Sequence, residues 1–202
     1  MTAYATATID SGFTEHLMQL RAAIDGRLDE LLPAASNERD LVAAAVRDGA
    51  LAPGKRMRPL LLLLAANGLG ASQRHALDMA CAIEMVHAAS LILDDMPCMD
   101  NAQLRRGRPT VHLAFGEDIA ILAAVALLSR AFGVVASIEG VRSLVRTQLV
   151  EILANTVGSQ GLVQGQLQDL RDGKHARSEE EIAATNNLKT CLLYTSPSPR
   201  DS

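Results

Sequence analysis

Apolar residues recur every three or four positions along most of the chain, a period that fits helices and not strands. The apolar residues are mainly Ala, Leu and Val, and the 202 residues include no Trp, three Phe and two Tyr. Small aliphatic side chains suit closely packed helices, whereas sandwiches and barrels favour aromatic and β-branched residues. We therefore predict an all-α fold, an antiparallel helical bundle around a central cleft. Helices are expected at 13–31, 36–46, 60–66, 73–95, 117–138, 141–157 and 159–171, with Ser36 as an N-cap. A capping box at Ser178–Glu181 predicts one more helix.

Composition and charge exclude several classes of protein. The chain is 49% hydrophobic and 21% charged, so it can bury a core. A net charge of −4 and few aromatic residues argue against a nucleic-acid partner. Three cysteines without a CxxC pair fit a reducing compartment, and no secretory signal is recognisable, so we expect a cytoplasmic protein. The segment Ile119–Ile138 is apolar but carries Arg130, which costs about 2.5–3.5 kcal/mol at a bilayer centre. We expect no membrane span.

An acidic cluster followed by two arginines is the most informative part of the sequence. Asp94, Asp95 and Asp100 end a long apolar helix, and Arg105 and Arg106 follow them. Clustered carboxylates repel one another unless a cation lies among them, and hard oxygen ligands suit Mg²⁺ bridged to substrate phosphates. On an unbroken helix Asp94 and Asp100 would point about 120° apart, so a break at Met96–Cys98 beside Pro97 is required to bring them together. A solvated helix end is the simpler interpretation of a bare acidic cluster, but the adjacent arginines favour a metal and phosphate site.

Other candidate groups are weaker when taken alone. Lys55, Arg56 and Arg58 form a basic cluster that is either a solvated helix start or a diphosphate clamp. His87 lies two turns before Asp94, about 10 Å along the same helix, and either packs in the core or donates to a phosphate. Gln166 and Asp169 share one helix face, and Lys189 and Thr190 are by default a surface pair.

Taken together, these segments resemble the trans-isoprenyl diphosphate (polyprenyl) synthases, and most of all the bacterial geranylgeranyl diphosphate synthases of carotenoid pathways. GKRMRP, EMVHAASLILDDMPCMDNAQLRRGRPT, GQLQD and LKT occur in the order of that family. The resemblance runs from about residue 10 to Thr190, which leaves 191–202 as a non-native or disordered tail. It implies the isoprenoid synthase type of bundle, here without its closing helices.

The resemblance implies a role for each matching residue. Lys55, Arg58, His87 and Arg106 are similar to the residues that hold the diphosphate of isopentenyl diphosphate. Asp94, Asp95 and Asp100 resemble the first aspartate-rich motif, whose Mg²⁺ ions bridge to the allylic diphosphate. Arg105, Lys189 and Thr190 resemble contacts to that diphosphate, and Gln166 and Asp169 match a motif near the same pocket. The implied substrates are isopentenyl diphosphate and dimethylallyl, geranyl or farnesyl diphosphate, and the implied assembly is a homodimer.

The implied reaction is Mg²⁺-assisted ionisation of the allylic diphosphate, followed by attack of the isopentenyl double bond and loss of a proton. Ala89 and Ser90, before the aspartates, leave room for a product of about twenty carbons, geranylgeranyl diphosphate. The family's second aspartate-rich motif has no counterpart after Thr190, so we expect these 202 residues alone to be inactive.

Two other classes of protein remain open from the sequence. A non-catalytic helical partner subunit would bind diphosphates without turnover, and the lack of a second motif favours it. Glu84 and His87 form half of a di-iron carboxylate motif, Glu-x-x-His, but a second copy is not recognisable.

Overall fold

The structure, a computed structural model, describes residues 11–172, 178–186 and 188, and nearly all of its regular structure is helical. The chain divides into two compact units, residues 1–134 and 135–202. In order, the elements are α1 (Ser11–Leu31), α2 (Leu41–Ala50), α3 (Met57–Gly68), α4 (Gln73–Asp94), β1 (Leu104–Arg105), β2 (Arg108–Pro109), α5 (Val111–Phe115), α6 (Glu117–Ala136), α7 (Ser143–Val157), α8 (Leu162–Asp172) and α9 (Glu179–Asn186). The predicted all-α class is confirmed.

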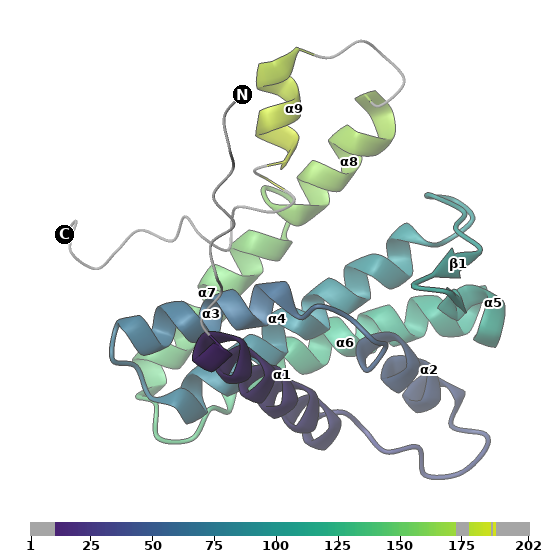
Figure 1. The fold of residues 1–202 in the computed structure, drawn as a ribbon. Coiled ribbons are helices and arrows are strands. Elements are labelled where there is room, and N and C mark those ends of the chain that lie inside the picture. The colour runs from purple at the N-terminus through teal and green to yellow at the C-terminus, as the bar shows by residue number, and fades with distance from the viewer. Residues whose placement is uncertain (1–10, 173–177, 187, 189–202) are drawn as a thin grey trace. The chain divides into compact units, whose positions relative to one another are not determined.

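Helix α4 is the central helix of the first unit and packs against α1, α2 and α3 (Figure 1). Its buried residues lie on all sides of the helix and include Cys81, Met85, Ala89 and Ile92. A helix that is apolar all round must be buried, and the absence of Gly and Pro from its interior keeps it unbroken over 22 residues. Because Asp94 is the last residue of α4 and Asp95 follows it directly, the packing of this helix fixes where both aspartates lie.

Helix α1 buries a single stripe, because its apolar residues recur every four positions. Ile24 and Leu28 are fully buried and Leu20 is nearly so. Replacing Leu28 with alanine should lower the free energy of unfolding by about 2–5 kcal/mol, since the deletion leaves a cavity in the core. Urea denaturation would measure the loss. Leu69→Ala is the matched control, because Leu69 is 85% exposed and should contribute little. Equal losses from both variants would contradict this packing.

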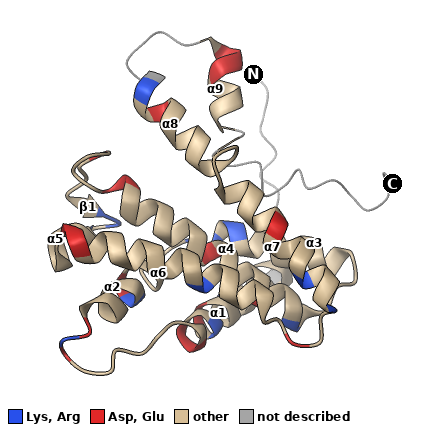
Figure 2. Ribbon diagram, turned by 180° about the vertical axis from the view of Figure 1, so that it is seen from behind, with Lys and Arg blue, Asp and Glu red and all other residues tan. Residues whose placement is uncertain are grey.

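Helix α6 closes the first unit beside the end of α1, where the Arg130 Nε donates a hydrogen bond to the carbonyl of Leu31 at 2.7 Å. Figure 2 shows α6 as a long and largely uncharged helix. Its Ala120, Ala123 and Leu127 are buried, whereas other apolar residues are exposed: Ile121 by 46%, Leu122 by 52% and Val125 by 59%. This helix therefore keeps an apolar face that the described residues do not cover.

Helices α4 and α6 are long and apolar enough to cross a membrane, by length and composition only. This is weak evidence, because the core helices of soluble proteins meet the same criterion. The most apolar window of α4 is 67% buried and that of α6 is 39% buried. Burial of α4 among its neighbours is typical of a core helix.

The second unit consists of α7, α8 and α9, with α8 in contact with both of the others. The capping box predicted at its last helix is confirmed: the Glu181 amide donates to the Ser178 hydroxyl, and the Ser178 amide donates to the Glu181 carboxylate. The Thr185 hydroxyl donates to Gln168 Oε1 at 3.0 Å and so joins α9 to α8. The proposed tail, 191–202, lies outside the described residues.

The structure corrects one expectation about local structure and adds two elements: the helix expected at 36–46 with Ser36 as its N-cap is observed as α2, Leu41–Ala50. The N-cap of α2 is Asp40, which accepts from the amide of Ala43, and Ser36 instead donates to the Asp40 carboxylate. The Asp40 carboxylate accepts hydrogen bonds both from the first turn of the helix and from the turn that precedes it, so it is a better N-cap here than a serine hydroxyl. The β1–β2 hairpin and α5 were not expected, because two-residue strands and a five-residue helix carry no periodicity.

Candidate functional site

Backbone strain marks two segments of the first unit. Among the described residues, the non-glycine residues with positive φ are Arg56 (51°), Asn101 (50°) and Arg106 (54°). Arg56 lies in the basic cluster, and the other two lie in the segment that follows the aspartates. Such conformations each cost about 1–3 kcal/mol and cluster at functional sites. The strained residues thus lie in the two segments that contain the basic motif and the aspartate–arginine motif.

An open cleft of about 540 Å³ lies between these segments and α4. Lys55, Arg58, His87 and Arg106 all line it, although they come from a loop, α3, α4 and the hairpin turn. From their motifs, Asp94, His87 and the basic segment Lys55–Arg58 are expected to point into one cavity. The structure bears this out for His87 and the basic segment, but Asp94 is not among the residues that line this cleft. The structure therefore gathers the four residues expected to hold one diphosphate, with three permanent or near-permanent positive charges.

The hairpin turn places Arg106 at this cleft. Arg106 and Gly107, with φ of 54° and 79°, form the two-residue loop between β1 and β2. Positive φ at both positions is the geometry of a type I′ turn, which suits the twist of a hairpin. The Arg106 Nη1 donates to the carbonyl of Pro53 at 2.7 Å, and a Cβ at Gly54 would collide with the guanidinium. Glycine at position 54 thus leaves room for Arg106.

His87 is held as a neutral imidazole inside the cleft. Its Nε2 lies 3.3 Å from the Arg58 Nη1. Burial, together with the positive charges of Arg58 and of further arginines (Arg106, Arg105 and Arg56), lowers the pKa of His87 to about 4. Because an arginine only donates, the Nε2 accepts from Arg58, and the remaining ring nitrogen carries the hydrogen. A diphosphate in the cleft would favour the charged imidazole and raise this pKa.

The lowered pKa of His87 predicts acid sensitivity. An unfolded histidine titrates near 6.5, so unfolding takes up a proton between about pH 6.5 and about pH 4. The contribution of neutral His87 to stability is therefore complete above about pH 6.5 and is lost as the pH falls towards 4. His87→Gln should make the urea midpoint less dependent on pH in this range. An unchanged dependence would contradict the burial of a neutral imidazole.

The chain reverses direction after α4, as the position of Pro97 predicted. The helix ends at Asp94, and the amide of Asp100 donates to the carbonyl of Asp94 at 2.9 Å. The amide of Ala102 donates to the carbonyl of Asp95 at 3.2 Å. These bonds bring the backbone of Asp100 next to that of Asp94, which an unbroken helix could not do.

The Asp95 carboxylate is occupied by Arg105. The Arg105 Nε lies 2.9 and 2.7 Å from the two oxygens of Asp95, and its Nη2 lies 2.5 Å from Oδ1. Asp95 is only 3% exposed, and this pairing raises the pKa of Arg105. A two-nitrogen, two-oxygen contact fixes both side chains. The aspartate motif and the arginine motif are thus directly joined.

The described residues contain no group of three or more His, Cys, Asp or Glu side chains that could hold a metal ion. A cage made by Asp94, Asp95 and Asp100 alone is therefore not preformed. Mg²⁺ usually keeps several waters and binds one or two carboxylates together with substrate phosphates. Asp94 and Asp100, joined through their backbones, supply hard oxygens of this kind, so the donor set fits Mg²⁺ held jointly with a diphosphate.

The remaining predicted residues lie elsewhere in the chain. Gln166 and Asp169 belong to α8 in the second unit, and Gln166 Oε1 is buried without a hydrogen-bond partner among the described residues. Lys189 and Thr190 lie outside the described residues.

The sequence did not predict a network of charged residues that borders the cleft. Arg56 is 5% exposed, and its guanidinium binds Asp25 of α1 and Glu84 of α4. Glu84, half of the possible di-iron motif, is thus committed to an arginine, which disfavours that interpretation. Arg56 was visible within GKRMRP, but no signal pointed to Asp25, 31 residues away.

Comparison with known proteins gives the family of the chain. The family model described as polyprenyl synthetase matches residues 39–198. The chain belongs to the polyprenyl synthetase family. A geranylgeranyl diphosphate synthase of Pantoea ananas is 61% identical over 178 residues, which are 87% of this chain and 59% of that protein. Its counterpart in Pseudescherichia vulneris is 52% identical over 178 residues, 87% of this chain and 58% of that protein.

An FPP/GFPP synthase of known structure shares the fold. The apo crystal structure of an FPP/GFPP synthase from Zymomonas mobilis has a TM-score of 0.86 at 36% identity. The match covers 92% of this chain and 68% of that one. The chain spans less than two thirds of the two bacterial relatives.

Proposed function

We propose that this chain is part of a prenyltransferase that condenses an allylic diphosphate with isopentenyl diphosphate and makes geranylgeranyl diphosphate. The observation that carries the proposal is the cleft in which Lys55, Arg58, His87 and Arg106 converge from separate segments of a polyprenyl synthetase. The names of the two bacterial relatives support the twenty-carbon product.

The cleft is suited to the diphosphate of isopentenyl diphosphate. Lys55 is exposed, and Arg58 and Arg106 present guanidinium groups whose paired N–H donors match phosphate oxygens. His87 accepts from Arg58 in the structure and gains a proton more readily when an anion binds. Three cations and one inducible cation can therefore neutralise most of a diphosphate's charge.

The allylic diphosphate is proposed to bind at the end of α4. Asp94, Asp95 and Asp100 are the proposed metal-binding motif, in which Asp94 and Asp100 would hold Mg²⁺ while Asp95 stays paired with Arg105. Mg²⁺ bound there would stabilise the charge that builds on the departing diphosphate. Arg105, Lys189 and Thr190 would contact the same diphosphate, with Gln166 and Asp169 near it. The Asp95–Arg105 pair would orient the guanidinium for this contact.

The proposed reaction needs no nucleophilic side chain. The allylic carbon–oxygen bond breaks, the double bond of isopentenyl diphosphate attacks the resulting cation, and the adduct loses a proton. The chain's own contribution is to hold two diphosphates in place and to exclude water, which would otherwise capture the cation.

The proposal extends to the location, the assembly and the pathway of the protein. A cytoplasmic homodimer that supplies carotenoid precursors fits the relatives' activity. The exposed apolar residues of α6, Ile121, Leu122 and Val125, support association with another polypeptide.

Titration of isopentenyl diphosphate into residues 1–202 tests the cleft directly. Lys55→Ala should weaken binding by about thirtyfold, because one charge-assisted contact is worth about 2 kcal/mol. Arg39→Ala is the matched control, since Arg39 is an exposed cation of the same unit outside the cleft. Equal losses from both variants would mean general charge attraction, and no loss from Lys55→Ala would remove the site assignment.

A further inference from the structure

Arg56 lies in the middle of the basic segment but does not face the same way as its neighbours. Lys55 and Met57 are exposed and Arg58 is half-buried, whereas Arg56 is 5% exposed. The left-handed backbone at Arg56, with φ of 51°, turns this one side chain inward. Arg56 also borders the cleft, but carboxylates hold its guanidinium, so the segment leaves Lys55 and Arg58 as its cations for a ligand.

Two carboxylates from different helices hold the Arg56 guanidinium. Its Nε donates to Asp25 Oδ1 of α1 at 2.8 Å, and its Nη1 donates to Glu84 Oε1 of α4 at 2.7 Å. The Arg56 and Glu84 side chains are each 4% exposed, while that of Asp25 is 43% exposed. Burial opposes a charged guanidinium, but the hydrogen bonds that Arg56 donates to Glu84 and Asp25 prevail and raise the pKa of Arg56. The Arg56–Glu84 contact at the centre of the network is therefore largely shielded from solvent, although both residues border the cleft.

The network also fixes the segment relative to His87. Glu84 and His87 are three residues apart on α4, so they lie on neighbouring positions of one helix face. Arg56 binds the first and Arg58 binds the second. Arg56 and Arg58 therefore contact two residues of α4 that lie one helical turn apart. These contacts fix the position of the basic segment along α4.

We propose that the Glu84–Arg56–Asp25 network positions Lys55 and Arg58 for the diphosphate of isopentenyl diphosphate, which makes Asp25, Arg56 and Glu84 positioning residues of that site. The inference rests on the proposed function. Buried ion pairs are a poor source of stability but can specify one arrangement, and preorganised cations bind an anion without reorganising. Without its anchor, the strained backbone at Arg56 would relax and carry Lys55 and Arg58 away from the cleft.

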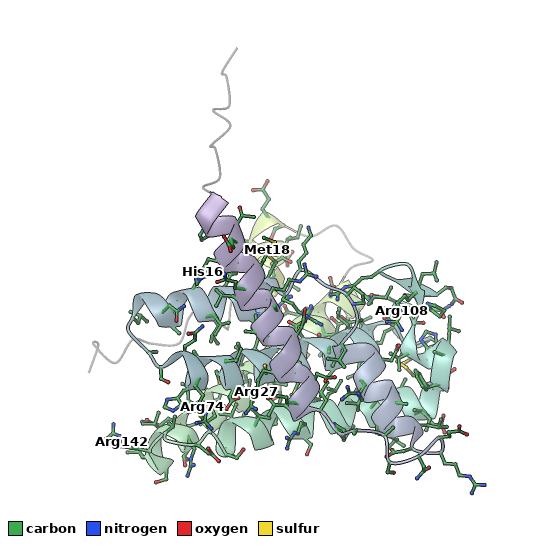
Figure 3. All side chains as sticks on the ribbon, turned by 60° about the horizontal axis from the view of Figure 1, so that its bottom comes forward. His16, Met18, Arg27, Arg74, Arg108 and Arg142 are labelled. Carbon is green, nitrogen blue, oxygen red and sulfur yellow. The ribbon has the colours of Figure 1, made fainter. Side chains whose placement is uncertain are left out.

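The molecule contains a matched control for this network. Arg27 of α1, labelled in Figure 3, donates from its Nε to Asp78 Oδ1 of α4 at 2.7 Å. The Asp78 side chain is 12% exposed and that of Arg27 is 32% exposed, so this is a part-buried ion pair between α1 and α4. Neither residue lines the cleft. Loss of the Arg27–Asp78 ion pair should weaken the packing of α1 against α4 without changing the proposed diphosphate site.

The test is titration of isopentenyl diphosphate into residues 1–202 and three variants, with thermal unfolding measured in parallel. Glu84→Gln should weaken binding by at least about tenfold, because a small displacement of binding groups has a large effect. Asp25→Asn should weaken it less, since the Asp25 side chain is 43% exposed. Asp78→Asn should lower the melting temperature but leave affinity within about twofold of the unaltered chain.

Each outcome decides the proposal. Wild-type affinity in folded Glu84→Gln and Asp25→Asn overturns it, as does an equal loss of affinity in Asp78→Asn. If Glu84→Gln does not fold, Asp25→Asn alone decides. Binding that is lost in Lys55→Ala but kept in both network variants refutes only the positioning role. If the unaltered chain does not bind isopentenyl diphosphate, the proposed function fails as well.

Discussion

Asp94→Ala is expected to abolish prenyl transfer. The suitable protein is a chimera of residues 1–190 with the part of the Pantoea ananas relative that this chain does not span. Asp94 ends α4, and the hydrogen bond from the Asp100 amide to the Asp94 carbonyl brings these two proposed metal ligands together in the chain. Loss of electrostatic stabilisation of a leaving group commonly costs about a thousandfold in turnover. Incorporation of labelled isopentenyl diphosphate into product would measure it.

Controls separate loss of the metal site from loss of folding. Glu38→Ala removes an exposed carboxylate of the same unit outside the site and should retain activity. Lys55→Ala should chiefly raise the KM for isopentenyl diphosphate, because it acts on the other diphosphate. Substantial turnover by Asp94→Ala, or activity of the unaltered chimera in excess EDTA, would contradict the proposed mechanism.

The long helices could be predicted because each buries a regular apolar face. The predicted helix 73–95 differs by one residue from α4, and 117–138 by two from α6. Helix starts are less predictable, since several polar residues compete to cap them. Ser36 and Asp40 are both good caps, and only the fold shows that Asp40 accepts from Ala43 while Ser36 binds Asp40.

The residues of the candidate site could be predicted where each belongs to a short motif that is recognisable in the sequence. Lys55, Arg58, His87 and Arg106 line one cleft, as their motifs implied. The pairing of Asp95 with Arg105 depends on a hairpin with two-residue strands, for which there was no alternating pattern. Arg106-Gly107 at the turn was the available signal, because two-residue hairpin loops with glycine favour positive φ. Asp25 was not predictable, because a contact between α1 and the loop at Arg56 leaves no local pattern.

Ala89→Phe is expected to shorten the product of the same chimera from twenty to fifteen carbons. Ala89 is fully buried on α4, five residues before Asp94, and Ser90 lies one turn before Asp94. If the prenyl chain grows along α4 from the aspartates, a phenyl group at Ala89 fills the space that the last isoprene unit needs. Overfilling a packed site costs about 1–3 kcal/mol, enough to stop elongation. Chromatography of the products would show the farnesyl compound replacing the geranylgeranyl compound.

Ala80→Phe is the control that distinguishes a blocked channel from a damaged core. Ala80 is also fully buried on α4, but nine residues at about 100° each place it on the opposite side of the helix from Ala89. Overpacking at Ala80 should lower stability and yield without changing the length of the product, because the phenyl group does not enter the same space. A farnesyl product from both variants would mean that chain length responds to core strain in general. An unchanged twenty-carbon product from folded Ala89→Phe would show that the chain does not grow along this face of α4.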